Sequence, residues 1–188
     1  MKIGLHMKLR WTSYFVTMPK GCRRLLSCLR HAPMAGLQKI ERVVILRFLL
    51  ILACVSLVLH LAWERAHLGL YTGYEGINGP LPIVLWASAG DVLYTLLAFL
   101  LVSFFKRRLH WVADAGRRDY AGLMALGFLV ALLVEYKAMF LERWAYAAAM
   151  PIIPFFGVGL SPVAQMTLLL PLSVLLAARM VRRAKEKL

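Results

Sequence analysis

The sequence is poor in acidic residues, histidine and cysteine, and these shortages exclude several kinds of site. Its 188 residues include nine Asp and Glu, five His and three Cys, against 23 Lys and Arg. The histidines are too few for a multi-histidine di-iron site, and the spacing of Cys22 and Cys28 matches no zinc-binding pattern. The chain also lacks a glycine-rich nucleotide loop, a nucleophile elbow and a metalloprotease motif. The sequence therefore predicts no cofactor.

Long hydrophobic runs are what the sequence has in abundance. Hydrophobic residues make up 61% of the chain, whereas a soluble domain has about 45–50%. Four runs are long enough to cross about 30 Å of hydrocarbon, and they cover residues 43–63, 83–105, 120–141 and 160–178. None alternates with a period of two, which excludes a transmembrane β-barrel. The predicted fold class is all-α, a polytopic membrane protein built as a four-transmembrane-helix bundle.

The net charge is +14, and the basic residues that produce it lie mostly on one side of the predicted membrane. Ten basic residues lie at or before Arg47, five between the second and third spans, and five after residue 178. Only Arg65, Lys137 and Arg143 fall on the other side, and a split of twenty to three is what the positive-inside rule predicts for two cytoplasmic termini. We therefore expect no nucleic-acid partner, and we expect membrane lipids to be attracted to the basic side.

The chain divides by composition into three parts. Residues 1–42 form a basic cytoplasmic leader, residues 43–180 the transmembrane domain, and residues 181–188 a basic cytoplasmic tail. Three readings of the leader stay open: a disordered segment, an amphipathic segment on the membrane surface, or translation that begins at Met34.

Polar residues near the end of the first span share one helical face. His60, Glu64 and His67 are spaced four and three residues apart, which places them together on a helix. A carboxylate between two imidazoles can bind a metal or relay a proton. The same residues also suit an ordinary membrane interface, where Trp63 and Tyr71 would belong to an aromatic belt. We predict no metal site, although this spacing leaves metal binding, proton transfer and ligand contact open.

Charged residues within spans are costly in a bilayer and are therefore candidates for function. Asp91 is the most deeply placed acid, and Tyr94 and Thr95 share its helical face. A hydrogen bond between helices is its simplest structural role. Glu135 marks the outer end of the third span and is expected to share a helical face with Glu142. Gln165 lies one turn into the fourth span.

The segment between the third and fourth spans is too apolar for a loop in water. Residues 150–162 (MPIIPFFGVGLSP) are also broken by Pro151, Pro154, Gly157 and Gly159, which makes a helix unsuitable. Non-helical backbone is tolerated at membrane depth only where protein buries it or where it lines a cavity. We therefore predict an irregular apolar outer loop packed over the bundle.

Polar groups of all four spans, four acids and Gln165, converge on the predicted outer half, together with aromatic residues. This convergence predicts an acidic, aromatic pocket open from the outer leaflet, although a polar network that holds the helices in register would have the same composition. Besides Glu64, His67, Asp91 and Glu135, the expected ligand-binding residues are Trp63, Tyr71, Tyr94, Glu142, Arg143, Trp144, Tyr146 and Gln165.

Three motifs carry a resemblance to known proteins. They are W-E-x2-H-x3-Y (Trp63, Glu64, His67, Tyr71), G-D (Gly90, Asp91) and E-x8-W-x-Y-x4-P (Glu135, Trp144, Tyr146, Pro151). Over residues 45–180 the chain resembles a family of small bacterial four-span membrane proteins of unassigned function. That resemblance implies a multi-pass protein of the bacterial inner membrane. The acid followed by W-x-Y and a proline also makes the chain faintly similar to membrane lycopene cyclases, which implies an isoprenoid substrate.

Two classes of function follow. In an enzyme acting on an isoprenoid or another lipid, Asp91 or Glu135 would donate a proton, with Glu64 and His67 assisting. Trp144 and Tyr146 would then stabilise positive charge. In a lipid-binding, transport or assembly protein, the same groups would hold a hydrophobic small molecule, a second copy of the chain or a partner subunit. Because no complete catalytic motif is present, the sequence favours the second class.

Overall fold

The structure is a computed structural model that describes residues 34–72 and 81–186, with side chains described within 43–72 and 81–184. The chain divides into a short unit, residues 1–43, and a main unit, residues 44–188. Of the short unit only the helical residues 34–43 are described. The three readings of the leader concern residues that lie outside the described ones. Everything below concerns the main unit.

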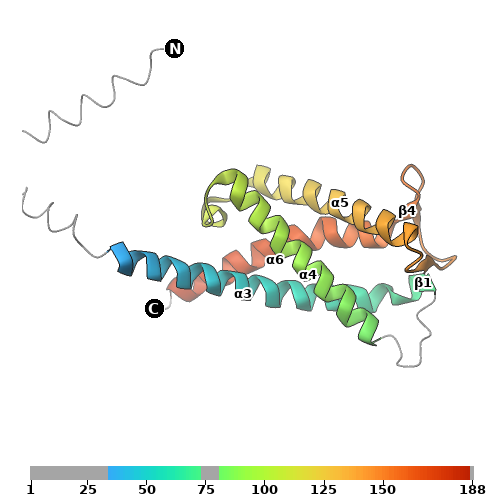
Figure 1. Cartoon of the computed structure of the whole chain (residues 1–188), viewed down its shortest axis with the longest axis horizontal. Coiled ribbons are helices and arrows are strands. Elements are labelled where there is room, and N and C mark those ends of the chain that lie inside the picture. Colours follow the sequence, from blue (N-terminus) through green and yellow to red (C-terminus); the bar gives the residue numbers. More distant parts are fainter. Residues whose placement is uncertain (1–33, 73–80, 187–188) are drawn as a thin grey trace, which may run out of the picture. The chain divides into compact units, whose positions relative to one another are not determined.

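Four long helices make up the main unit (Figure 1). Their apolar stretches are 24 to 28 residues long, which is enough to cross a membrane. The prediction of an all-α, four-helix bundle is therefore confirmed, and the four apolar helices indicate a multi-pass membrane protein. The helices are α3 (Met34–His67), α4 (Leu81–Lys106), α5 (Arg117–Phe140) and α6 (Leu160–Glu186).

The bundle exposes apolar side chains and buries one helix more than the others. Trp86 and Phe140 are 80% and 87% exposed, an arrangement that only lipid can cover at low cost. In α6, 56% of the apolar stretch is buried inside the protein, against 22–33% in the other three helices. The polar groups that α6 carries therefore lie where the other helices can reach them.

Helices α5 and α6 approach most closely at Gly127. A Cβ atom there would overlap the backbone oxygen of Met166 and would lie 3.0 Å from its carbonyl carbon and 3.3 Å from the Cα of Thr167. Small residues permit such close backbone contact between helices in lipid. Gly127 is therefore required by the packing of α5 against α6.

The ends of α4 and α5 are set by residues in the left-handed region. Arg107 and Glu142 both have φ of 51°, directly past the last turn of each helix. In each case the next amide bonds back into the helix, from Arg108 N to Ser103 O at 3.1 Å and from Arg143 N to Ala138 O at 2.9 Å. Glu142 consequently leaves the helical face of Glu135.

Short strands join the loops at one end of the bundle, here called the strand end. β1 (Tyr71–Thr72) pairs antiparallel with β2 (Ala145–Tyr146), and β3 (Ile152–Ile153) pairs with β4 (Val158–Gly159). The loop between α5 and α6, which was expected to be irregular, thus contains β2, β3 and β4. β1 and β2 connect the chain after α3 to the chain after α5, a link that no sequence pattern indicated.

The opposite end, here called the loop end, carries residues 107–116 and is closed by Trp111. This side chain lies in the 3-10 helix η2 (Trp111–Asp114), is 2% exposed, and stacks on Phe99 with ring centroids 5.8 Å apart. Its Nε1 donates to Ser103 Oγ at 2.9 Å, while the Ser103 hydroxyl donates to Phe99 O at 2.8 Å. The indole is therefore held by both packing and a hydrogen bond.

Removing the indole donor tests this contact. We expect Trp111→Phe to lower the free energy of unfolding by about 1 kcal/mol through the lost hydrogen bond, in addition to the cost of the smaller ring. Ser103→Ala should remove the same bond, so the double variant should cost less than the sum of the single variants. Unfolding in mixed micelles measures the three values, and strict additivity would contradict the contact.

Candidate functional site

Gln165 is the centre of a buried polar cluster formed by Gln165, His60, Glu64 and Asp91. It belongs to α6 and is 2% exposed. Its Nε2 lies 3.0 Å from Oε1 of Glu64 and 2.8 Å from Oδ2 of Asp91. Nε2 also lies 3.0 Å from Nδ1 of His60. One amide group thus joins α6 to two residues of α3 and one of α4.

When Glu64 and Asp91 are ionised, the protons of the polar cluster have one consistent assignment. An amide nitrogen carries two hydrogens, and carboxylates only accept, so Gln165 donates to Glu64 and to Asp91. Nδ1 of His60 lies 3.3 Å from Oδ2 of Asp91 and is the donor of that contact. Nε2 of His60 is then buried without a hydrogen-bond partner among the described residues. The imidazole is fully buried, so this atom is the one unused polar position of the cluster.

His67 extends the polar cluster to the start of α6. Its Nε2 lies 3.1 Å from Oε2 of Glu64, and its Nδ1 lies 2.7 Å from Oγ of Ser161. The indole of Trp63 donates to the same hydroxyl at 3.3 Å. The face shared by Glu64 and His67, as the sequence spacing indicated, is therefore turned toward α6.

Glu135 lies under a separate group of aromatic residues. It is 3% exposed, and its Oε2 accepts hydrogen bonds from Tyr146 and, at 3.4 Å, from Trp144. Burial and the hydrogen bond to Glu135 raise the pKa of Tyr146, so the phenol stays a donor at neutral pH.

Tyr71, Trp144 and Tyr146 form a layer of rings that we call the aromatic cap. The ring of Tyr71 lies 6.1 Å from Trp144 and 5.8 Å from Tyr146, and 5.3 Å from the imidazole of His67. Backbone pairing of β1 with β2 sets Tyr71 opposite Tyr146. The aromatic cap thus connects the surroundings of Glu135 with those of Glu64.

Among the described residues, buried charged groups do not continue through the bundle to the loop end. One turn below the polar cluster, Ser56 Oγ donates to Thr95 Oγ1 at 3.2 Å, and both residues are fully buried. Below that pair the buried layer is mostly apolar, and it includes Phe48 and Phe99, whose ring centroids are 5.0 Å apart. Its buried hydroxyls, those of Ser103 and Ser173, donate to backbone oxygens of their own helices. Its other members include Leu52, Leu170 and Val174. Within the described residues the polar cluster is therefore closed toward the loop end.

The charges of this region are unbalanced. Glu64 and Asp91 form ion-pair contacts with His67 and His60, and within residues 43–72 and 81–184 no Lys or Arg pairs with either acid or with Glu135. Three carboxyl groups therefore face two imidazoles, and a further positive charge or hydrogen-bond donor would be favoured at the strand end.

Metal binding by His60, Glu64 and His67 was one reading of their spacing. In the structure His60 contacts Asp91 and Gln165, whereas His67 contacts Glu64 and Ser161. Across the described residues no group of three His, Cys, Asp or Glu side chains is arranged to hold a metal ion.

Three expected ligand-binding residues lie away from the polar cluster. Tyr94 packs against the apolar core, while Glu142 and Arg143 are exposed beyond the end of α5. The prediction that Glu142 shares a helical face with Glu135 is wrong, because α5 ends at Phe140 and Glu142 adopts a positive φ. A ligand-binding role for these three residues stays a prediction.

Ser161 and His60 have larger roles than the sequence indicated. Ser161 accepts from Trp63 and contacts His67, although its sequence context, Ser161-Pro162, signals only the start of a helix. His60 was a member of a spaced trio, yet its partners come from α4 and α6. Contacts between helices carry no local signal in one sequence.

No known protein family, curated protein or solved structure matches this chain. The resemblance to small four-span bacterial proteins and to lycopene cyclases therefore stays a prediction. The function has to be argued from the site itself.

The hydrogen bond of Tyr146 to Glu135 can be tested against a matched tyrosine. We expect Tyr146→Phe to lower the free energy of unfolding by about 1–3 kcal/mol, because a buried carboxyl loses a donor. Tyr136, whose hydroxyl donates to Phe156 O at 2.8 Å, is an exposed control. Tyr136→Phe should cost less, and equal costs for the two variants would contradict a special role of Tyr146.

Proposed function

We propose that this protein is a small binding protein of the bacterial inner membrane, with both termini cytoplasmic and the strand end outside. Its ligand is a lipid-soluble molecule, or a group of a partner subunit, that carries positive charge or hydrogen-bond donors. The polar cluster and the aromatic cap together form the binding region. Glu64, Asp91, Glu135, Trp144 and Tyr146 are the residues that we expect to matter most.

One observation carries this proposal: the buried Glu135 and the partly buried Glu64 and Asp91 lie at the strand end, and among the described side chains none of them pairs with Lys or Arg. Carboxylates attract a cation, and the faces of Trp and Tyr rings add cation–π attraction. Buried ionisable groups in a membrane are costly and are functional candidates for that reason. A cationic or donor-bearing ligand matches all three features.

The closed loop-end side of the polar cluster favours binding over passage through the bundle. Below Ser56 and Thr95 the buried layer is mostly apolar and holds no charged side chain among the described residues, so a charged solute would meet a costly barrier there. At the strand end the described strands are short, since β1 and β2 are two residues each. Entry from that end would exchange contacts of the aromatic cap for contacts with the ligand.

A photo-crosslinking experiment tests the proposal. The full-length protein in phosphatidylcholine nanodiscs is exposed to a long-chain alkyl amine with a diazirine on its chain, or to the matched alkyl alcohol. We expect the amine to label residues 142–161 and the end of α3 more than the alcohol does, and Asp91→Asn to remove the difference.

Asp114→Asn is the matched control, because Asp114 is an exposed acid paired with Arg108 at 2.9 Å at the loop end. This variant should label like the unchanged protein. Equal labelling by amine and alcohol, or labelling insensitive to Asp91→Asn, would overturn the proposal.

Acid–base chemistry on an isoprenoid is the second candidate, favoured by the contact of Tyr146 with Glu135 beside the aromatic cap. A carbocation would be stabilised by the same rings and acids. This candidate predicts that Glu135→Gln changes the lipid profile of the cell while the protein remains folded. An unchanged profile would exclude it.

A further inference from the structure

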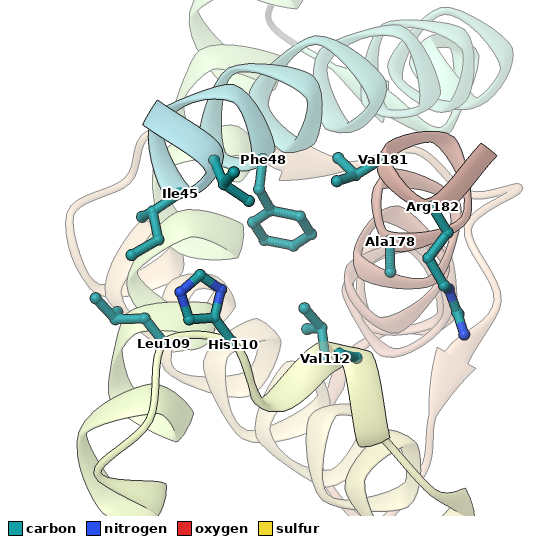
Figure 2. Close-up of a pocket in the computed structure, with 10 residues that line it drawn as sticks. Ile45, Phe48, Leu109, His110, Val112, Ala178, Val181 and Arg182 are labelled. Carbon is teal, nitrogen blue, oxygen red and sulfur yellow. The ribbon is translucent and has the colours of Figure 1, made fainter. Parts of the chain in front are cut away.

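A groove at the loop end is remote from the polar cluster. It has an empty volume of about 530 Å³, part of which is open to the outside. Figure 2 shows the rings of Phe48 and His110 and the side chain of Val112 in the groove, with Arg182 at its margin. The other lining residues are Val44, Ile45, Leu109, Ala113, Ala178 and Val181.

Three elements build this groove, and nearly all of its lining is apolar. α3 contributes Phe48, the chain before α5 contributes Val112, and α6 contributes Val181. An apolar groove between membrane helices fits a hydrocarbon chain. His110 and Arg182 are its only polar lining residues among those described.

The charge around the groove is strongly positive. Of the side chains that the structure describes, the two acids at this end are already paired, Asp114 with Arg108 at 2.9 Å and Asp119 with Lys106 at 2.6 Å. At this end the exposed arginines that take part in no ion pair within the described side chains are Arg47, Arg107, Arg117, Arg118, Arg179, Arg182 and Arg183. An apolar groove with surplus cations at its margin is complementary to an amphiphile with an anionic head.

We propose that this groove binds one acyl chain of an anionic phospholipid and that Arg182 holds the phosphate of its headgroup. Arginine suits this role because its guanidinium binds phosphate through two parallel hydrogen bonds. Basic pockets between membrane helices bind anionic headgroups by the same chemistry. The proposal does not depend on the ligand of the strand end.

Lipid titration of the full-length, delipidated protein followed by native mass spectrometry tests this proposal. Phosphatidylglycerol and phosphatidylcholine with identical acyl chains are compared. We expect phosphatidylglycerol to bind more tightly, and Arg182→Gln to weaken it about fivefold, the equivalent of about 1 kcal/mol for one basic residue. Glycerol phosphate, which has no acyl chain, should not bind.

Two further variants locate the site. Ala113 is exposed and lines the groove, so Ala113→Phe should fill it and cause loss of the bound-lipid peak without a change in folding. Arg118 is exposed and does not line the groove, so Arg118→Gln should bind phosphatidylglycerol as the unchanged protein does. Equal affinity for the two lipids, or a lipid peak that survives Ala113→Phe, would overturn the proposal. A dimer mass that Ala113→Phe abolishes would assign the groove to a second copy and would overturn it as well.

Discussion

Replacing Gln165 with leucine should destabilise the protein more than any other single change in the polar cluster. The amide donates to Glu64 at 3.0 Å and to Asp91 at 2.8 Å, and both bonds cross between helices. Interhelical hydrogen bonds in membranes average about 0.6 kcal/mol each. Loss of the amide also leaves two partly buried carboxyl groups with one donor fewer, at about 1–3 kcal/mol. We expect Gln165→Leu to lower the free energy of unfolding by about 2–4 kcal/mol.

Thr167 is a matched control on the same helix. Its hydroxyl donates to Val163 O at 2.7 Å, a bond within α6 that joins no other helix. Thr167→Val should therefore change the free energy of unfolding by less than Gln165→Leu does. Unfolding by sodium dodecyl sulfate in mixed micelles provides both values. If the two substitutions cost the same, the amide is not the centre of an interhelical network.

Adding one methyl group at Gly127 should also be strongly destabilising. The new Cβ would overlap the carbonyl group of Met166, and a backbone group cannot rotate away as a side chain can. Overpacking of a close-packed interior costs about 1–3 kcal/mol, and contact with backbone places Gly127→Ala near 3 kcal/mol. Met166 directly follows Gln165 in α6. A shift of α6 away from the new methyl group should therefore also disturb the polar cluster.

Gly122, on the same helix, is a control for helix propensity. A Cβ there would meet nothing within 4 Å, so Gly122→Ala adds a better helix former without a clash. We expect it to be neutral or to stabilise by up to about 1 kcal/mol. A destabilisation as large as that of Gly127→Ala would show that close packing of α5 on α6 is not the cause.

The helices were predictable from the sequence because a membrane requires long apolar runs, and length and hydropathy are local properties. The predicted first span stopped at residue 63, whereas α3 continues to His67. That extra turn carries Glu64 and His67 on the helix, and it turns both toward α6. Boundaries of this kind depend on tertiary contacts such as that of His67 with Ser161.

The membership of the site was only partly predictable. Glu64, Asp91, Glu135 and Gln165 were identified because polar groups are costly in lipid. The central position of Gln165 depends on contacts among α3, α4 and α6. The position of Glu142 depends on its positive φ just past the end of α5. The aromatic cap depends on the pairing of β1 with β2, two strands too short to leave a pattern.

Native mass spectrometry of the full-length protein, gently extracted from its own membrane, tests the central claim most directly. The account predicts a co-purifying lipid-soluble molecule or partner polypeptide that Asp91→Asn removes and Asp114→Asn retains. A bare protein mass, or an adduct that survives Asp91→Asn in a folded protein, would contradict a binding site formed by the polar cluster and the aromatic cap.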